Sequence, residues 1–580
     1  MAFEPIIARS YAVFSTLLYL VLAGGATPSA NQPKVLSKHP GDGERGASGG
    51  AMVFDHPGGF YESPFALAVS APDAWATIYY TTNGASPQPS IALLYVQPIA
   101  ITSTTIVRAA AFSHGTNLTG TAARTYLFVP DILKQTGAQF PRVWGTNQGQ
   151  PVPAHYGMAT ASMENAASRQ AVAEGLRSGA TLSVIADPGD LFSTETGIYA
   201  HPLERGTAWE RPVAVEMMDA EGRPLFHCAG GMRIHGSTSR HPEESPKHSF
   251  RLIFRSRYGS PRLHFPVFGP GGAQEFDTLI LRAGNNNSWL DSNGEGRRRA
   301  DYLRDEWMRR SMLAMGYPCA RGIFVHLYLN GLYWGLYNLC ERPGSSLLGA
   351  GQNDPAPGFD GRKADKIESG DEVAWSKMMA LANSGVGDER SYQAILDYLD
   401  LPELVDYLIL NLYAGNSDWD RSANWYAARP RIPGGRFRFF VWDAERTLEA
   451  ADADTINFDD DECPARLFQK LSENAKFHSF FAERVQLLCS NNGPLAPKVA
   501  AERYRALANS IQKAVPAEAA RWGAYRRDVH PYKTGPYERY TCEEHWRVEV
   551  SRILNDYFPE RLAFLLNQLR ERGLFPATLK

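Results

Sequence analysis

The chain has 580 residues, of which 44% are hydrophobic, and a formal net charge of −3. This length allows roughly two to four domains with substantial cores. The near-neutral charge excludes the broad basic field typical of nucleic-acid-binding proteins, so we expect no nucleic acid partner. The six cysteines show no CxxC or Cys/His spacing of a zinc site. Their even number permits disulfides, but mostly buried thiols are an equally good interpretation.

The N-terminus has the pattern of an export signal. Arg9 precedes an apolar run over residues 11–22, and small residues follow it up to Ala26 or Ala30. This order is typical of a signal peptide, and the run is too short for a membrane span. We therefore expect residues 1–30 to be a signal peptide. The mature protein is then secreted or on the cell surface, with no stable membrane span.

A linker and a small β-domain are expected next. Residues 31–50 are Gly, Ser, Pro and charged residues without periodicity, which predicts a linker. Short β-rich runs follow at regular spacing, with turn residues such as Asn-Gly between them. Strands this short at such intervals predict a small β-sandwich. The runs cover residues 65–71, 76–82, 92–101, 104–112 and 123–129.

The segments IYYTTNGASPQPS and TTIVRAAAF in this β-domain resemble the Ig-like domain at the C-terminal end of chitobiases. The resemblance covers residues 51–129 and is to a module common in exported bacterial proteins. It implies an accessory or spacer module, with a carbohydrate contact as the other possibility. No ring of aromatic residues indicates a sugar platform, so a spacer is favoured.

A mixed lead-in is expected over residues 130–225, with one helical run at 164–179. Beyond it, a glycine-bearing segment at 230–236 predicts a turn, and Lys247 enters a predicted strand at 249–254. A lysine beside a strand can neutralise phosphate charge, and glycine amides can approach phosphates closely. Taken alone, such a lysine is more often a solvated surface residue. Arg233, Arg240 and Arg282 can each bind phosphate or pair with a structural carboxylate.

The most informative stretch runs from residue 401 to residue 445. Apolar residues at helical spacing, with Asp400 and Pro402 as start signals and Gly415 as a stop, predict a buried helix. This helix delivers the loop 416–420. Two β-rich runs then flank a Pro-Gly-Gly turn and predict a hairpin. They cover residues 424–429 and 436–442.

The predicted hairpin brings polar side chains together at its open end. Asn424 and Asp443 are expected to face each other, with Asp418 on the same rim. Protein kinases hold their catalytic base and metal ligands in the same order along the chain: a loop carboxylate, an amide, a hairpin and then a second carboxylate. Mg²⁺ prefers such hard oxygen ligands. The other interpretation is that Asp443 caps a turn and Asp418 caps a helix.

Several blocks in this order together resemble the CotH family of atypical protein kinases. They are GMRIHGSTSR, SPKHSFRLIF, FDTLILRAGNNNSW, YLRDEW, LYLNGLYWGLYNLCERP, GNSDWDRSAN and FFVWDAE. The resemblance spans residues 180–470. It implies a minimal kinase-like fold that uses ATP and Mg²⁺ or Mn²⁺ to phosphorylate Ser or Thr on a secreted or cell-surface protein.

The resemblance also implies roles for individual residues. Asp418 matches the family's catalytic base or metal-orienting acid. Asn424 and Asp443 would hold the metal ion. Lys247 would contact the phosphates, with Glu341 as a candidate partner of the lysine. Arg233 and Gly236, singled out from their own residue types, are further candidates for binding the nucleotide. One departure is Asn287, which stands where relatives have aspartate; activity depends on whether that carboxylate is needed.

The fold class expected from the sequence is therefore α+β. A kinase-like domain over residues 226–480 follows the Ig-like β-sandwich, and residues 481–580 form a helical extension without chemistry of its own. The alternative function is a catalytically silent surface adhesin or carbohydrate-associated module on the same fold. AMP transfer at the same site is a third possibility.

Overall fold

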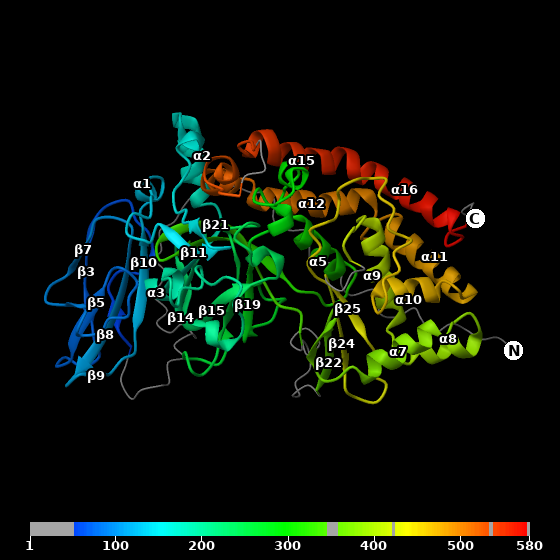
Figure 1. The fold of residues 1–580 in the computed structure, drawn as a ribbon, viewed down its shortest axis with the longest axis horizontal. Helices are drawn as coiled ribbons and strands as arrows, with labels where there is room; N and C mark the ends of the chain where they lie inside the picture. The colour runs from blue at the N-terminus through cyan, green and yellow to red at the C-terminus, as the bar shows by residue number, and fades with distance from the viewer. Residues whose placement is uncertain (1–50, 345–357, 420–423, 533–536, 577–580) are drawn as a thin grey trace, which may run out of the picture. The chain divides into compact units, whose positions relative to one another are not determined.

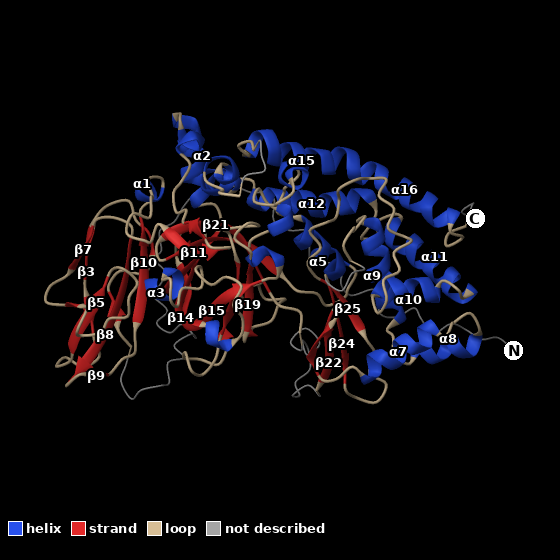
Figure 2. Ribbon diagram, in the orientation of Figure 1, coloured by secondary structure: helices blue, strands red, loops and turns tan. Residues whose placement is uncertain are grey.

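The computed structural model describes residues 51–344, 358–419, 424–532 and 537–576. The expected signal peptide and linker lie outside the described residues. Figure 1 and Figure 2 show a β-rich N-terminal part followed by a mixed part of sheets and helices. The α+β class expected from the sequence is confirmed.

The N-terminal part is a β-sandwich. Its larger sheet has the order β2-β10-β8-β5-β6, with β9 beside β8, and the pairs β1-β4 and β3-β7 complete it. Leu67, Ile101, Val107 and Tyr126 are fully buried in its core. The predicted run 92–101 divides into two short strands. The strands are β1 Val53–Phe54, β2 Gly59–Phe60, β3 Phe65–Leu67, β4 Val69–Ser70, β5 Thr77–Thr81, β6 Leu93–Leu94, β7 Ile99–Ile101, β8 Thr105–Ser113, β9 Thr116–Asn117 and β10 Ala122–Leu127.

A connecting segment leads to the second part of the chain. The predicted helix at 164–179 is confirmed as α2, and its N-terminus is capped by Asn165, whose side chain accepts from the Ser168 amide at 2.8 Å. The elements are α1 Val129–Ile132, β11 Val143–Asn147, β12 Gln150–Pro153, η1 Thr160–Met163 and α2 Ala166–Leu176.

A closed barrel with the order β13-β14-β15-β16-β19-β21-β20 follows. It begins at Ala180, so the end of the expected lead-in is part of the barrel. Alternate residues such as Ile234 and Phe250 fill its interior. The barrel strands are β13 Ala180–Ala186, β14 Arg211–Met218, β15 Pro224–His235, β16 Ser249–Ile253, β19 Thr278–Arg282, β20 Gly322–Leu329 and β21 Leu332–Cys340, with β17 Leu263–His264 and β18 Glu275–Phe276 as a separate pair.

The turn predicted over residues 230–236 is wrong, because residues 230–235 end the 12-residue strand β15. The glycines have a packing role. A Cβ on Gly231 would lie 2.5 Å from the ring of Tyr258, so only glycine lets that ring lie against the strand. Gly236, with φ 115°, ends the strand in a conformation that favours glycine.

The Asn-Gly pair of the block LYLNGLYWGLYNLCERP forms the hairpin between β20 and β21. Asn330 and Gly331 have φ values of 47° and 79°, as a type I′ turn requires. The Asn330 side chain also accepts from the Ala186 amide at 2.8 Å and donates to its carbonyl at 2.9 Å. The turn therefore anchors the end of β13, which pairs in parallel with β20 and closes the barrel.

The last part combines the sheet β23-β22-β24-β25 with helices. The predicted helix after Asp400 is confirmed as α9, where the Asp400 side chain accepts from the Glu403 amide. In Figure 1, α9 lies beside β25, and α12 and α16 run past one another. The strands are β22 Phe359–Lys363, β23 Lys366–Ser369, β24 Trp425–Pro430 and β25 Arg438–Val441.

The helices of the second part come from three stretches of chain. Those before the second sheet are α3 Pro188–Phe192, η2 Thr207–Trp209, η3 Thr238–Arg240, η4 Asn285–Asn287, α4 Gly294–Arg298 and α5 Arg304–Ala314. Those within it are α7 Val373–Asn383, α8 Glu389–Leu396 and α9 Leu401–Tyr413. Those after it are α10 Pro464–Leu471, α11 Ala475–Cys489, α12 Pro497–Ile511, α13 Val515–Glu518, η5 Ala519–Gly523, α14 Tyr525–Asp528, η6 Cys542–Trp546, α15 Arg547–Arg552, η7 Ile553–Tyr557 and α16 Phe558–Glu571.

The cysteines agree with the interpretation as thiols. All six lie in the described part of the chain, and all but Cys228 are buried. Cys228, Cys319, Cys340, Cys489 and Cys542 are free thiols. Within the described residues, no helix is both long and apolar enough to cross a membrane.

A buried carboxylate between the sandwich and the barrel makes stability depend on pH. Glu216 on β14 is buried, with Oε1 3.8 Å from Nη1 of Arg124 on β10. Burial raises the pKa of Glu216, and Arg124 offsets this only in part, so the pKa is about 7. A raised carboxyl pKa stabilises the fold fully below the unfolded pKa, near 4.5, and this contribution is lost as the pH rises through 7.

We therefore expect wild type to lose roughly 1–3 kcal/mol more unfolding free energy between pH 5 and pH 8 than Glu216→Gln does. Urea denaturation across this range measures the difference. Glu195→Gln, at an exposed position, is the matched control and should follow wild type. Equal pH slopes for wild type and Glu216→Gln would contradict the expectation.

Candidate active site

The hairpin β24–β25 places the predicted acidic and amide residues at one end of the second sheet. Trp425 pairs with Val441, so Asn424 is opposite Trp442 and Asp443 is one residue further on. The expectation that Asn424 and Asp443 face each other was wrong by one position. Both residues have left-handed φ values, 70° and 56°, which Asn and Asp adopt more readily than most residues.

Asp443 is held by two cations from different sheets. Its Oδ1 is 2.8 Å from Nη1 of Arg282 on β19, and its Oδ2 is 3.2 Å from Nζ of Lys363 on β22. Burial alone would raise the pKa of Asp443, but Lys363 and Arg282 outweigh it and hold the pKa well below its usual range. Asp443 therefore remains ionised next to the barrel.

Arg282 joins the barrel to the hairpin and to helix α5. Besides Asp443, its guanidinium pairs with Glu445, and its Nε is 3.4 Å from Oδ2 of Asp305. The guanidinium also lies 4.7 Å from the ring centroid of Trp442. Because this buried cation contacts three carboxylates, it fixes where the segment after β25 lies against the barrel.

The carboxylates around Arg282 differ in their electrostatics. Burial, with the neighbouring charges of Asp305 and Asp443, raises the pKa of Glu445 to about 7 against the pull of Arg282. Asp305 is buried too, yet Arg282 and Arg309 hold its pKa below its usual value. Its Oδ1 also accepts from the Ala444 amide at 3.0 Å. Helix α5 is therefore coupled to the chain directly after Asp443.

A small cavity of about 20 Å³ lies beside this cluster. Such a volume holds about one water molecule. Polar side chains surround it, so a water there would find partners. Its walls include Arg282, Asn287, Tyr302, Asn338 and Glu445.

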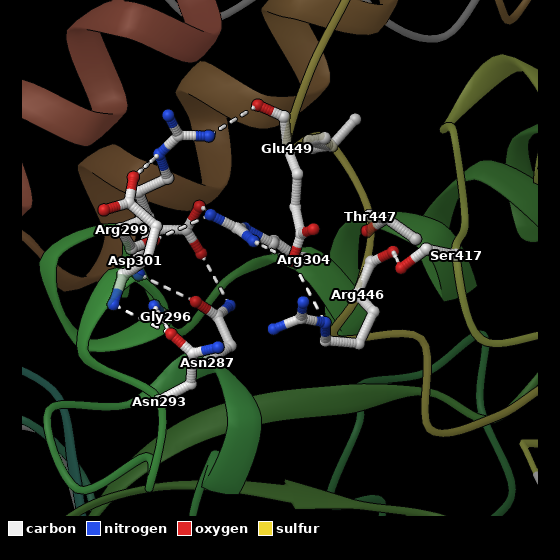
Figure 3. Close-up of polar contacts among 12 residues, drawn as sticks. Asn287, Asn293, Gly296, Arg299, Asp301, Arg304, Ser417, Arg446, Thr447 and Glu449 are labelled. Carbon is white, nitrogen blue, oxygen red and sulfur yellow. Dashed lines mark hydrogen bonds and ion pairs between the residues drawn. The ribbon is translucent and has the colours of Figure 1, made fainter. Parts of the chain in front are cut away.

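The loop with Asp418 is fixed at the same end of the hairpin. Oδ2 of Asp418 accepts from Nδ2 of Asn424 at 2.6 Å, so these two predicted residues are neighbours. Asn416 orients the loop by accepting from the Asp418 amide at 3.1 Å, and Trp419 is fully buried beneath it. The Ser417 amide donates to the Arg446 carbonyl at 3.0 Å, which ties the loop to the segment after Asp443 (Figure 3). Asp420 lies outside the described residues.

Lys247 does not lie beside Asp443. It is buried, and its Nζ is 2.6 Å from Oε1 of Glu518 on α13 and 2.8 Å from the Leu336 carbonyl. A Cβ on Gly335 would lie 2.6 Å from the other Glu518 oxygen, so glycine makes room for this pair. Both Lys247 and Asp443 are among the described residues, and no hydrogen bond or ion pair joins them. Arg282 and Lys363 instead supply positive charge at Asp443.

Other expected site residues also lie apart from Asp443. Glu341 was expected to pair with Lys247, but its Oε2 accepts from the Arg321 amide at 2.8 Å. Arg240 donates to backbone carbonyls, among them those of Pro202 and Glu204 at 2.9 Å, so its donors are already used. Arg233 is the exception: it is half-buried on β15, two residues before that strand ends at His235.

Asn287 has a structural role where relatives were expected to have aspartate. Its Nδ2 donates to Oδ1 of Asp301 at 2.7 Å, and its Oδ1 accepts from the Asp301 amide at 2.9 Å. Figure 3 shows the two side chains facing each other, with Arg304 between Asp301 and Glu449. An amide suits this position because it donates and accepts at once.

We expect Asn287→Asp to lower the unfolding free energy by roughly 2–4 kcal/mol, since it places two buried carboxylates against each other. Urea denaturation at pH 8 measures the loss. Asn117→Asp, at an exposed position of the sandwich, is the control and should change little. A variant as stable as wild type would show that the position accepts a charge.

Two protein families match the chain, one in each of its two parts. Residues 232–565, more than half of the chain, match the family described as CotH kinase protein. The chain belongs to the CotH kinase family. Residues 56–123 match the chitobiase/beta-hexosaminidase C-terminal domain, which agrees with the sandwich. The comparison with curated proteins gave no match.

The CotH match extends past the domain boundary expected at residue 480. It runs to residue 565 and so includes α13, whose Glu518 pairs with Lys247 in the barrel. The C-terminal helices therefore complete the CotH region. Sequence reasoning missed Glu518 and Lys363 because neither stands in a recognisable motif. It gave Asp305 no role, although Asp305 lies in the CotH-like block YLRDEW. Arg282 was noticed, but its sequence neighbours did not reveal its three carboxylate partners.

Proposed function

We propose that this CotH-family protein transfers the γ-phosphoryl group of ATP to a Ser or Thr hydroxyl of a secreted or cell-surface protein. One observation carries the proposal: an ionised carboxylate, Asp443, is held by Lys363 and Arg282 at the end of a hairpin whose other strand begins at the Asp418–Asn424 pair. Kinases need these groups together.

In the proposed reaction Asp418 orients the acceptor. Its carboxylate lies on a loop fixed by Asn416 and Trp419, as a positioned general base requires. The acceptor oxygen forms a bond to the γ-phosphorus while the bond to the ADP oxygen breaks. The hydroxyl proton passes to Asp418. Asn424, through its bond to Asp418, keeps that carboxylate in place.

Asp443 and Asn424 offer the hard oxygen atoms that Mg²⁺ or Mn²⁺ prefers. The described residues contain no group of three or more His, Cys, Asp or Glu able to hold a metal ion. The residues therefore fit an ion that arrives with phosphate oxygens and water as its other ligands, as Mg²⁺ commonly does. Such an ion would neutralise the charge of the phosphates.

Lys363 and Arg282 have separate roles in this proposal. Lys363 is partly exposed, with its Nζ 3.2 Å from Asp443 and 5.9 Å from the ring centroid of Trp442, so its long side chain can turn to a phosphate oxygen. Arg282 is buried among three carboxylates and serves to position Asp443. Lys363 thus takes the phosphate-binding role that the sequence assigned to Lys247.

The sandwich is proposed to act as a spacer, with a carbohydrate contact as the second possibility because its matched family is named for carbohydrate-processing enzymes. Export would bring the protein to its acceptor outside the cytoplasm. A catalytically silent adhesin on the same fold is the competing function. Transfer of AMP instead of phosphate is the third.

The test is transfer of label from γ-labelled ATP to the protein or a generic acceptor, with Mg²⁺ or Mn²⁺. We expect transfer by wild type, and a loss of at least about a hundredfold in Asp418→Asn and Asp443→Asn. Asp397→Asn, at an exposed position outside the site, should retain activity. Mass spectrometry of the acceptor distinguishes phosphate from AMP. No transfer and no nucleotide binding by folded wild type would favour the silent module.

A further inference from the structure

Two arginines lie directly opposite each other on the outer face of the barrel. Arg233 on β15 pairs with Arg251 on β16 across the strands. Their neighbours Ile234 and Phe250 are buried inside the barrel, so the arginines point the other way. Both are half-buried.

These two arginines have few partners of their own. Among the described residues, Nη2 of Arg251 makes a 3.4 Å bond to the Thr278 hydroxyl, and the buried Nε of Arg251 has no hydrogen-bond partner there. Arg233 forms no ion pair within the described residues. The acid that acts on it, Glu210, is already paired with Arg257 at 2.5 Å. Like charges directly opposite on a sheet destabilise it.

A third arginine adds to the charge at this place. Burial, together with the charges of Arg342 and Arg233, lowers the pKa of Arg251 to about 10, against the opposing effect of Glu368 and Asp277. Arg342 follows β21 and pairs with Glu368 on β23. Positive charge at this place therefore exceeds the acidic charge around it.

The arginines adjoin the candidate active site. His235 lies two residues beyond Arg233 on the same face of β15. Burial, with the charges of Lys363 and Arg282, holds the pKa of His235 well below its usual value, against Asp443. Two residues of a strand span about 7 Å. A bound group could therefore contact the arginines at one end and approach Lys363 at the other.

We propose that Arg233, Arg251 and Arg342 form an oxyanion-binding site for phosphate groups, next to the Asp443 cluster. Guanidinium groups bind phosphate oxygens through paired, charge-assisted hydrogen bonds. A phosphate between the opposed arginines would supply the counter-charge that the described residues do not. The site exists whether or not transfer occurs; only the source of the phosphate rests on the proposed function.

Two sources share this chemistry. The phosphate chain of ATP would run from the arginines towards Lys363, or a phosphorylated residue of the acceptor would bind there and favour a second phosphorylation nearby. The arms of one binding experiment separate these sources.

The experiment titrates the full protein with tripolyphosphate in metal-free, low-salt buffer by calorimetry. We expect saturable binding that weakens about tenfold or more in Arg233→Gln and in Arg251→Gln. Arg390→Gln, exposed on α8, removes the same charge elsewhere and should bind as wild type does. Asp443→Asn should bind undiminished, which separates failure of this site from failure of the proposed transfer.

A stability measurement accompanies the titration. Because Arg251→Gln removes a like-charge pair, we expect it to unfold at the same temperature as wild type or higher. Competition then identifies the source: displacement by ATP indicates the donor, and displacement by a phosphoserine peptide alone indicates the acceptor. Either displacement supports the site. Absence of binding, equal binding by Arg251→Gln, or a large loss of its stability overturns the proposal.

Discussion

Replacing Arg282 by Gln is expected to lower the unfolding free energy by about 3–5 kcal/mol. The guanidinium is buried and contacts Asp305, Asp443 and Glu445, so its loss leaves three carboxylates near one another without their shared cation. Arg282→Lys should recover only part of the loss, because an ammonium cannot reach three partners in different directions. Urea denaturation at pH 8 measures both effects.

A control variant and a double variant show whether the loss of stability comes from the contacts of Arg282 with its carboxylates. Arg505→Gln, exposed on α12, should change stability by less than about 0.5 kcal/mol. Asp305→Asn combined with Arg282→Gln should lose less than the sum of the single losses, because the two groups interact. A loss below about 1 kcal/mol in Arg282→Gln would show that the carboxylates do not depend on it.

The second large effect is expected at the buried pair of Lys247 and Glu518. Either Lys247→Met or Glu518→Gln leaves one charge in the barrel without its partner, which costs about 3–5 kcal/mol. The double variant Lys247→Met/Glu518→Gln should lose less unfolding free energy than the two single variants lose together. A double-mutant cycle by urea denaturation measures this coupling.

This cycle also separates two roles for Lys247. The sequence predicted contact with phosphates, whereas the structure predicts a contribution to stability through Glu518 and Leu336. A Lys247→Met protein of wild-type stability that no longer binds ATP would contradict the structural role. Lys377→Met, exposed on α7, is the matched control.

Local patterns predicted much of the fold. Asp400, Pro402 and the apolar spacing after them predicted α9, and the Asn330–Gly331 pair predicted a hairpin that closes the barrel. The hairpin β24–β25 was also predicted, but its register was not. Both strands are buried on both faces, so their hydrophobic pattern does not fix the register. Asn424 is opposite Trp442.

The candidate site was predicted only in part, for a physical reason. Asp418 and Asn424 are close in sequence and were placed together correctly. The partner of Lys247 is 271 residues away, and nothing near either residue encodes that contact. Gly231 is a second case that the sequence could not settle. A glycine can indicate either a turn or close packing of a neighbour against the backbone, and the contact with Tyr258 shows that Gly231 is the second kind.

The most direct test is a crystal structure with Mn²⁺ and a non-hydrolysable ATP analogue. We predict an anomalous manganese peak in direct contact with Asp443 and phosphate oxygens, with Lys363 turned from Asp443 to the phosphates and Arg282 in place. Manganese and nucleotide bound away from Asp443, with the contacts of Lys363 and Arg282 to that carboxylate unchanged, would contradict the proposal that Asp443 is the centre of phosphoryl transfer.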